Sequence, residues 1–581
     1  MKKNPALRWL WNISGRRKLY IVALSVLQMI SGASGVLYAL LMRGIVDCAT
    51  AGDSPGFWRY VLYTVLLVSS QILLGAILRA LYERCHISLE NAFKSRLLNE
   101  LLRRDYASVA SVHTGEWLNR LTSDTSVVAG SLSSIMPSLF GMSVKLVSAM
   151  VMIIVLEKRF ALLMLAGGIA VFVFTIVFRK KLKQLHKIVQ EADGRLRVFL
   201  QERLGSMMMI RSFAAEEETK ESANERMAGY RKARLSRNRF SNICNVGFSA
   251  AMSGMYLLGF CWCGYGILHK TMTFGTLTAI TQLIGQIQSP FANLGGIVPR
   301  YYSMIASAER LMEVESLPEC SSELFSIDEI LDFYHGEFAA LSLEAVSYSY
   351  YPPSEKVEIP DKSSMPVALQ DASLQVSKGE ILALTGHSGC GKSTALKLLM
   401  GVYTPDSGKI MILKKSEESE PVTEKWRRLF AYVPQGNALM SGTIRDAIAF
   451  ADPSRKEDDE AIHTALRVAC AEEFILELEK GIDTALGERG AGLSEGQLQR
   501  ISLARAVFSN SPVMLLDEAT SALDTETEKQ LLENLKRMTD KTVVIITHRP
   551  AALSICDRVL HFSEEGSIDL VKQDVIPQMQ I

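Results

Sequence analysis

A glycine-rich segment in the second half of the chain has the residue types and spacing of a phosphate-binding loop. It follows the strand-like segment 381–385, which is apolar through Leu384, and ends where the helix-forming segment 395–400 begins. In such a loop, backbone N–H groups surround phosphate oxygens at the N-terminus of a helix. Lys392 can reach the β and γ phosphates, and the Ser393 hydroxyl can bind magnesium. We therefore expect ATP and Mg²⁺ to bind here, at Gly386, His387, Ser388, Gly389, Cys390, Gly391, Lys392, Ser393 and Thr394.

An acidic pair, Asp517 and Glu518, follows a second apolar run with the pattern of a buried strand, residues 513–516. An aspartate at the end of such a strand can hold the magnesium shell, and the adjacent glutamate can polarise the water that attacks the γ phosphate. Because strands often end in solvated acids, the pair alone is weak evidence. Together with the phosphate loop, it indicates ATP hydrolysis with Glu518 as the base.

The elements that must position these residues lie in a chain that divides into two halves. Long apolar runs lie before residue 300, whereas the remainder alternates strand and helix patterns. The net charge of +1 gives no indication of nucleic acid as a partner. None of the nine cysteines has metal-ligand spacing, so we expect reduced thiols. These features predict a helical membrane domain followed by an α/β phosphate-loop ATPase domain.

Six stretches are long enough to cross a bilayer, which requires about 20 mostly apolar residues. They cover residues 19–42, 60–82, 132–156, 160–178, 241–268 and 277–299. The basic segment 1–18 has no clear cleavage site, so we expect a retained first span, without a cleaved signal peptide or a preceding peptidase domain. The expected domains are a cytoplasmic segment at 1–18, a transmembrane domain at 19–315, a linker at 316–340 and a nucleotide-binding domain at 341–581.

The basic residues predict the orientation of these spans. Segments 1–18, 83–131 and 179–239 hold 28 lysines and arginines, whereas the loops 43–59, 157–159 and 269–276 hold five. Because basic loops remain in the cytoplasm, the first set and the ATPase domain are predicted to be cytoplasmic, in a bacterial plasma membrane. The alternative, that the runs are buried core helices of a soluble protein, does not explain this asymmetry.

Further motifs resemble those of the ABC transporter family. The sequence Leu-Ser-Glu-Gly-Gln at 493–497 resembles the family signature, whose common form has glycine in place of Glu495. Gln435, Asp524 and His548 resemble the glutamine of the Q-loop, the aspartate of the D-loop and the switch histidine.

Two more segments extend the resemblance. Tyr350 corresponds to the aromatic residue that stacks on adenine, with Tyr348 and Tyr351 as alternatives. Residues 487–490 resemble the segment that contacts the membrane domain. The segments 113–124 and 205–218 resemble the cytoplasmic loops that couple the two domains.

The resemblance implies a polytopic α-helical membrane domain with six spans in the ABC exporter fold, followed by an ABC nucleotide-binding domain. It implies magnesium bound by Ser393, Gln435 and Asp517, and catalysis by Glu518 and His548. It also implies two copies in head-to-tail contact. The γ phosphate bound by one copy would meet the signature residues of the other, namely Ser494, Gly496 and Gln497.

These implications leave alternatives open. The second copy would be identical, because Glu518 and His548 are both present, or a related half-transporter. Glu495 would point away from the phosphates or face and repel them. The cargo implied by the family is a drug, lipid or peptide moved outward; uptake of a siderophore or vitamin, or a channel or regulatory role, is the alternative. A soluble ABC ATPase is excluded by the six apolar stretches.

One basic residue, Lys145, lies deep within a predicted span. A charge at that depth costs several kcal/mol unless it faces water or a partner, so an intramembrane lysine is a functional candidate. Lys145 would attract an anionic group of the cargo in a central cavity. Alternatively, it would reach the cytoplasmic interface along its own helix, or be hydrated in a wide cavity.

Overall fold

The computed structural model describes residues 5–320, 323–351, 367–436, 439–487, 492–563 and 568–571. The chain divides into two compact units, a helical unit of Met1–Ser95 and Thr122–Arg310 and an α/β unit of Arg96–Leu121 and Leu311–Ile581. The first segment of the α/β unit is joined to the chain after α10, because the Arg103 carbonyl accepts from Cys320 N at 2.8 Å. This segment lies inside the range 19–315 expected for the transmembrane domain.

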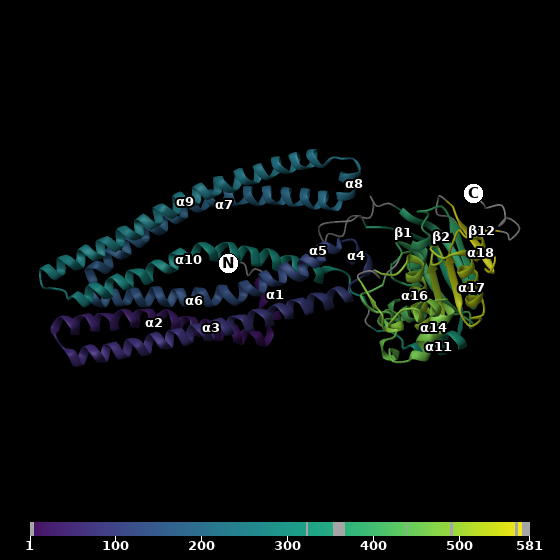
Figure 1. Ribbon diagram of the computed structural model, residues 1–581, viewed down its shortest axis with the longest axis horizontal. Helices are drawn as coiled ribbons and strands as arrows, with labels where there is room; N and C mark the ends of the chain where they lie inside the picture. Colours follow the sequence, from purple (N-terminus) through teal and green to yellow (C-terminus); the bar gives the residue numbers. More distant parts are fainter. Residues whose placement is uncertain are drawn as a thin grey trace. The chain divides into compact units, whose positions relative to one another are not determined.

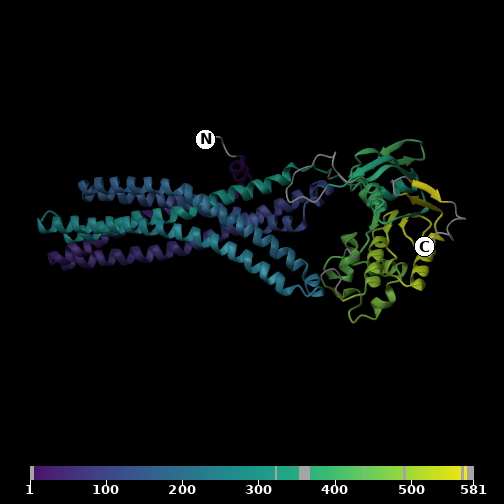
Figure 2. The ribbon, with the colours of Figure 1, turned by 90° about the horizontal axis from the view of Figure 1, so that it is seen from above.

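Long helices make up the helical unit (Figures 1 and 2). They are α2 (Lys18–Ala51), α3 (Ser54–Arg103), α6 (Thr125–Leu156), α7 (Lys158–Gly205), α9 (Glu216–Leu268) and α10 (Phe274–Glu313), with the short α1 (Pro5–Ile13) and α8 (Met207–Ser212). The ends of α3 and α10 belong to the α/β unit. Each of the six apolar stretches lies within one of the long helices. Only Glu157, with an extended backbone, separates α6 from α7.

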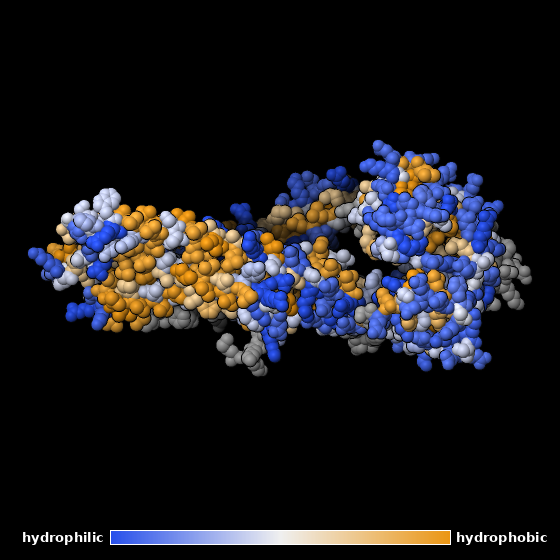
Figure 3. All heavy atoms as spheres, turned by 90° about the horizontal axis from the view of Figure 1, so that it is seen from below, coloured by the Kyte–Doolittle hydropathy of each residue, from blue (hydrophilic) through white to orange (hydrophobic). Residues whose placement is uncertain are grey.

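The surface of the helical unit is suited to lipid. Hydrophobic side chains gather over it in Figure 3, while most of the surface of the α/β unit is hydrophilic. On α3, for example, Trp58, Ile72 and Leu73 are each at least 64% exposed. Among the described residues, four helical segments are long and apolar enough to cross a membrane: Gly15–Ala51, Ser54–Arg103, Thr114–Leu156 and Glu216–Leu268.

Small residues let α2 and α6 approach closely. A Cβ at Gly32 would lie 2.6 Å from the Gly141 carbonyl oxygen, and a Cβ at Gly141 would lie 2.5 Å from the Gln28 side chain. Such close helix contacts replace the hydrophobic driving force that is absent in lipid. Five helices then contribute to one core: Val36, Ala39, Ala149, Ile153, Phe160, Ala161, Met164, Cys263, Ile280, Leu283, Ile284 and Ile287.

The α/β unit contains two main sheets. A mixed sheet has the order β12-β11-β3-β10-β9-β6, in which the inner strands are parallel and β12 is antiparallel. Its strands are β3 (Ile381–Gly386), β6 (Phe430–Val433), β9 (Val513–Asp517), β10 (Thr542–Ile546), β11 (Arg558–Phe562) and β12 (Ile568–Val571). An antiparallel sheet has the order β2-β1-β4-β5, from β1 (Phe338–Ser349), β2 (Val367–Ser377), β4 (Ser407–Lys414) and β5 (Ser419–Pro421). A short pair, β7 (Gly442–Thr443) and β8 (Ala485–Leu486), completes the strands.

Helices such as α14, α16 and α17 lie beside these sheets (Figure 1). The helices of the α/β unit are α4 (Tyr106–Ala110), α5 (Thr114–Asn119), α11 (Ile327–Gly336), α12 (Lys392–Leu399), α13 (Ile444–Ala449), α14 (Asp459–Val468), α15 (Glu472–Leu476), α16 (Glu495–Phe508), α17 (Thr525–Lys536) and α18 (Pro550–Leu553).

The parallel strands are buried on both faces. In β9, Val513 and Leu515 belong to the core shared with the antiparallel sheet, whereas Met514 and Leu516 belong to the core formed with helices such as α14 and α16. Successive strand residues point to opposite faces, so a strand between two cores must be apolar throughout. The uninterrupted apolar runs 381–384 and 513–516 follow from this arrangement.

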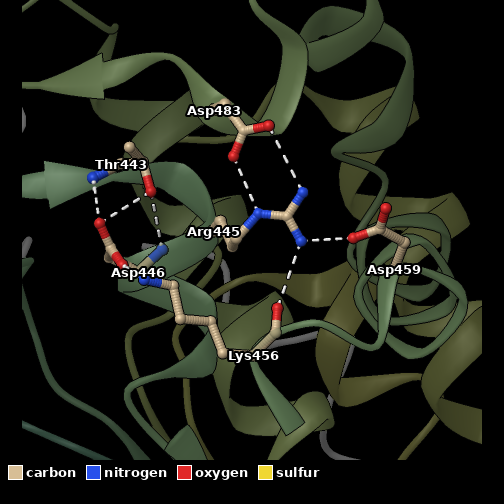
Figure 4. A network of polar contacts seen from close by, with 6 residues as sticks. All are labelled: Thr443, Arg445, Asp446, Lys456, Asp459 and Asp483. Atoms are coloured by element: carbon tan, nitrogen blue, oxygen red, sulfur yellow. Dashed lines mark hydrogen bonds and ion pairs between the residues drawn. The ribbon is translucent and has the colours of Figure 1, made fainter.

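A charged network holds the start of α13 (Figure 4). It consists of Thr443, Arg445, Asp446, Lys456, Asp459 and Asp483. Thr443 and Asp446 form a capping box, and Arg445 Nε donates to Asp483 at 2.8 Å. Lys456 Nζ lies 2.7 Å from Asp446, and this contact is the largest of the causes that lower the pKa of Asp446. Each cation of the network therefore has an acidic partner within the unit.

Candidate nucleotide site

The predicted nucleotide-site residues emerge at one edge of the mixed sheet. Parallel strands β3, β10, β9 and β6 end there, and the chain continues from them into the phosphate loop, His548, Glu518 and Gln435 respectively. Open parallel sheets bind ligands at this edge, beyond the carboxyl ends of their strands. The fold therefore gathers groups that lie up to 162 residues apart in the sequence, between Gly386 and His548.

The phosphate loop joins β3 to the N-terminus of α12. Gly391 has a φ of +96°, and a Cβ there would lie 2.4 Å from the Ala368 carbonyl oxygen. Only glycine satisfies both the left-handed backbone and the close approach. The loop thus leads its backbone directly into the helix N-terminus, where N–H groups can meet an anion.

Lys392 lies against its own loop. Its side chain is buried, and Nζ donates to the Gly386 and His387 carbonyls, at 2.7 Å each. These acceptors are neutral, and the described residues form no ion pair with Lys392. The ammonium charge is therefore available to phosphate at the loop.

Hard oxygen donors meet next to Lys392. Ser393 Oγ donates to Asp517 Oδ1 at 3.0 Å, and the Tyr432 hydroxyl donates to Asp517 Oδ2 at 3.1 Å. Burial raises the pKa of Asp517, although both hydrogen bonds oppose the shift. Mg²⁺ prefers few protein carboxylates together with water and phosphate oxygens, so Ser393 and Asp517 fit this ion. Clusters of three or more His, Cys, Asp or Glu that could hold a metal are absent among the described residues.

Glu518 is held in a strained backbone conformation. Its φ is +50°, which is uncommon for a residue with a side chain. The Glu518 N–H donates to the Ile546 carbonyl at 3.1 Å, and Gln435 Nε2 donates to Glu518 Oε2 at 2.9 Å. Strain of this kind persists where the surroundings impose it, as at functional sites. The two contacts fix the carboxylate at the end of β9.

His548 completes the group. Burial lowers its pKa, the positive charge of Lys392 lowers it further, and the charge of Glu518 opposes both. Burial and Lys392 therefore favour the neutral imidazole, which lies within electrostatic range of the lysine and the glutamate. A neutral imidazole can accept or donate a hydrogen bond.

The three candidate tyrosines differ in their surroundings. Tyr348 is 3% exposed and stacks on Tyr403, with ring centroids 5.0 Å apart, so its ring belongs to the core. The Tyr350 hydroxyl lies 2.7 Å from Thr394 Oγ1 of the phosphate loop, and the Tyr350 ring is only partly buried. Tyr350 is thus attached to the loop, and its contact with adenine remains a prediction, as it does for Tyr351.

The signature residues begin helix α16. Ser494 and Gln497 form a capping box: Ser494 Oγ accepts from Gln497 N at 3.3 Å, and Gln497 Oε1 accepts from Ser494 N at 2.8 Å. Glu495 is exposed at the first helical position. A Cβ at Gly496 would lie 2.8 Å from the Ala522 carbonyl oxygen. Within the described residues, neither Ser494 nor Gln497 forms a hydrogen bond with residues 386–394.

The segment 521–524 is held from two sides by residues that the motifs did not single out. Gln499 donates to Ser521 Oγ at 2.9 Å and accepts from Ala522 N at 3.0 Å. Arg549, directly after His548, donates to the Ser521 and Leu523 carbonyls. Asp524 caps α17 by accepting from Thr527 N at 3.0 Å. The signature helix and the histidine segment are therefore connected through this loop.

Gln499, Arg549 and Tyr432 had no signal of their own in the sequence. Each of these side chains forms a hydrogen bond to a segment that is distant in the sequence. Only the position of Arg549 directly after His548 could have indicated that it belongs to the site. Residues 488–490 of the predicted motif at 487–490 lie outside the described residues.

Comparison with known proteins agrees with these motifs. The model of the ABC transporter transmembrane region matches residues 21–291, and the ABC transporter model matches residues 369–521. A bacterial Atm1-family ABC exporter with ATP bound is 21% identical, with a TM-score of 0.77 and coverage of 96% of both chains, which shows a shared fold.

Curated relatives extend the match. ABC transporter B family member 1 of Dictyostelium discoideum is 30% identical over 78% of this chain and 48% of its own length. The cyclolysin secretion/processing ATP-binding protein CyaB of Bordetella pertussis is 30% identical over 69% of this chain and 54% of its own length. The chain thus spans about half the length of the curated relatives it matches. With both domain models in the expected order, the chain belongs to the ABC transporter family, and the predicted fold class is confirmed.

Proposed function

We propose that the chain is one half of an ATP-driven exporter, which hydrolyses ATP at the edge of the mixed sheet. The observation that carries this proposal is the cluster at that edge: Lys392 with no acidic partner among the described residues, Ser393 against Asp517, and Glu518 against Gln435. This arrangement supplies a cation for phosphate, oxygen donors for Mg²⁺ and a carboxylate for the attacking water. Magnesium would neutralise developing charge on the phosphate oxygens.

Each residue of the cluster has its own role in ATP binding or hydrolysis. Lys392 would leave its loop carbonyls to hold the β and γ phosphates, while Ser393, Asp517 and Gln435 would hold the metal. Glu518 orients the attacking water and accepts its proton, and His548 donates a hydrogen bond toward the γ phosphate. Tyr350 stacks on adenine.

A second copy completes each site in this proposal. Ser494, Gly496 and Gln497 lie at the N-terminus of α16, where Ser494 is exposed. Among the described residues, Ser494 and Gln497 make no hydrogen bond to residues 386–394, which suits contact with a nucleotide on another subunit. We infer a homodimer, since Glu518 and His548 are both present, and a related half-transporter is the other candidate partner. Asp524 would lie at the same interface.

The membrane part of the proposal rests on the helices and on the relatives. We infer six spans, in α2, α3, α6, α7, α9 and α10, with the N-terminus and the α/β unit in the cytoplasm of a bacterial cell. The names of matched relatives refer to secretion and translocation, including the alpha-hemolysin translocation ATP-binding protein HlyB of Proteus vulgaris. These names favour outward transport of a drug, lipid or peptide over uptake.

The test compares Lys392→Ala with Lys409→Ala in full-length protein reconstituted in phosphatidylcholine vesicles. Lys392→Ala should weaken binding of a fluorescent ATP analogue and reduce ATPase activity at least tenfold. Lys409 is exposed on β4, so its replacement should change neither quantity. ATPase activity in Lys392→Ala equal to that of the wild type would contradict the proposed function.

A further inference from the structure

The amino group of Lys145 is held between two membrane helices. Nζ donates to Ser289 Oγ of α10 at 2.7 Å. At 1.5 Å per residue, Lys145 lies about 16 Å from the end of α6 at Leu156, and Ser289 lies about 22 Å from the start of α10 at Phe274. Both residues are therefore deep within a hydrocarbon core of about 30 Å.

The chain supplies no acidic partner at this depth. The segments 18–46, 54–82, 125–156, 158–190 and 226–308 contain neither aspartate nor glutamate. These segments include the apolar parts of all six long helices. A second, identical copy would bring the same segments, so it cannot neutralise the lysine either.

A structural lysine in the same protein has different contacts. Lys541 is buried in the α/β unit and donates to three oxygen atoms, the Asn510 carbonyl, Asn510 Oδ1 and the Ser511 carbonyl. An ammonium group has three donors, so Lys541 is fully satisfied. Within the part of the chain that the structure describes, Lys145 has one acceptor. Two of its donors thus remain for a ligand.

The helix that carries Ser289 has a polar face. Thr278, Gln282, Gly285 and Ser289 recur at intervals of three and four residues, which places them on one side of α10. The opposite side carries Ile280, Leu283, Ile284 and Ile287, all buried in the core of the helical unit. Gln282 and Gly285 are exposed in the single chain. A polar face is unfavourable against lipid, so it lines a wet cavity or an interface within the transporter.

Two glycines of α2 leave room for Lys145 of α6 and Gln286 of α10. The Lys145 backbone lies against Gly32, where an added Cβ would be 3.3 Å from Lys145 N. The Gln286 side chain lies against Gly35, where an added Cβ would be 2.9 Å from three of its atoms. Gln286 Oε1 is buried and finds no hydrogen-bond partner among the described residues. Gln286 of α10 and Lys145 of α6 therefore lie against two glycines of α2 that are one helical turn apart, Gly35 and Gly32.

We propose that Lys145 and Ser289 form an anion-binding subsite for the cargo, which takes the carboxylate or phosphate group of an amphiphilic molecule. Two free N–H groups of Lys145 donate to the anion, and the Ser289 hydroxyl, which accepts from Lys145, donates its own proton to the same group. The apolar part of the cargo lies along the bundle. This inference rests on the proposed function, because it makes the subsite part of the transport path.

The test measures binding separately from ATP hydrolysis. Full-length protein in phosphatidylcholine nanodiscs is titrated with N-lauroylglycine, which is anionic, and with N-lauroylglycinamide, which has the same chain and no charge. The wild type should bind the acid more tightly than the amide. In Lys145→Met the dissociation constant of the acid should rise at least about tenfold, because the variant removes the hydrogen bonds from a charged donor to the anion. Binding of the amide should not change.

Three further variants define the outcome. Lys158→Met removes an exposed lysine from the start of α7 and should leave both constants unchanged, while Lys145→Arg should keep the preference for the acid. Ser289→Ala should weaken acid binding by a smaller factor. An equal ratio of the two constants in the wild type and in Lys145→Met would overturn the proposal, whether or not the protein hydrolyses ATP.

The source of the anion is distinguished by adding phosphatidylglycerol to the nanodiscs. Competition with N-lauroylglycine in the wild type, lost in Lys145→Met, would identify a lipid phosphate as the ligand. Acid binding that is insensitive to phosphatidylglycerol would identify a cargo that is not a bilayer lipid.

Discussion

The α/β unit and the helical unit balance their charges in different ways. In the α/β unit, Arg445 contacts Asp459 and Asp483, Lys456 contacts Asp446, and Arg549 contacts Glu528. At mid-depth in the helical unit, Lys145 contacts a serine, and the surrounding apolar segments contain no acid. A cation whose partner is built into the chain serves the fold, whereas a cation without one is available to a ligand.

Lys392 connects the two cases. It lies in the α/β unit, where acids are plentiful, yet its acceptors are the carbonyls of its own loop. Among the described residues, Lys392 therefore forms no ion pair, and it lies at a site that the phosphate loop identifies. The same reasoning, applied to Lys145, identifies a site for which no motif exists. Substitutions that distinguish charges paired within the chain from charges available to a ligand therefore test this difference between the two units.

The largest effect is expected at Glu518. Glu518→Gln keeps the shape of the side chain and its contact with Gln435 but removes the carboxylate that accepts a proton. Loss of a general base typically lowers turnover 10²–10⁴-fold. ATPase activity in proteoliposomes should fall by that factor, while binding of a fluorescent ATP analogue should persist.

The matched control for Glu518 is Glu495→Gln, which removes an exposed carboxylate at the start of α16. If Glu495 points away from the phosphates, its replacement should leave turnover unchanged. An increase in turnover would indicate repulsion of the nucleotide by Glu495. Retention of more than about a tenth of the activity in Glu518→Gln would remove Glu518 from the role of base.

The two units also differ in how far the sequence predicts them. The family, the fold class and the nucleotide-binding domain were predicted correctly, because a phosphate loop needs glycines, a lysine and a serine at fixed spacing. The apolar runs predicted both the membrane helices and the buried strands, because a helix in lipid and a strand buried on both faces each require uninterrupted apolar sequence. Ser289 beside Lys145 and Gln499 beside Ser521 could not be predicted, since each pair joins distant segments through side chains that have no periodic pattern.

A smaller effect is expected at Gly496, which tests whether the signature helix acts by its position. In Gly496→Ala the new Cβ would lie 2.8 Å from the Ala522 carbonyl oxygen, so α16 and the loop 521–524 must move apart. A displacement of about 1 Å near a reacting group can cost 10²-fold in rate. Turnover should therefore fall roughly 10–100-fold, whereas ATP binding, which relies on Lys392, should change little.

Gly336→Ala is the control for this substitution. Gly336 ends α11 in the same unit, and a Cβ there meets nothing within 4 Å. Its activity should equal that of the wild type. If Gly496→Ala were fully active, the close contact between α16 and the segment 521–524 would have no bearing on catalysis.

The smallest effect concerns the paired charges of the α/β unit, represented by Asp446. Its carboxylate contacts Lys456 and caps α13, and these contacts lower its pKa below the ordinary value of about 3.9. A depressed pKa means that the folded state prefers the carboxylate, so its stabilising contribution is present above the unfolded pKa and is lost as the pH falls through the folded pKa.

In Asp446→Asn, the apparent melting temperature of the full-length protein should be lower by roughly 2–4 °C at pH 7, as expected for a helix cap. The difference from the wild type should be constant between pH 6 and 8 and should shrink below about pH 4. Glu479→Gln, which removes an exposed glutamate without an ion pair among the described residues, should show no difference at either pH. A difference for Asp446→Asn that stayed the same at acidic pH would mean that the charge of Asp446 does not stabilise the fold, and that the paired charges of this unit are not the structural counterpart of Lys145.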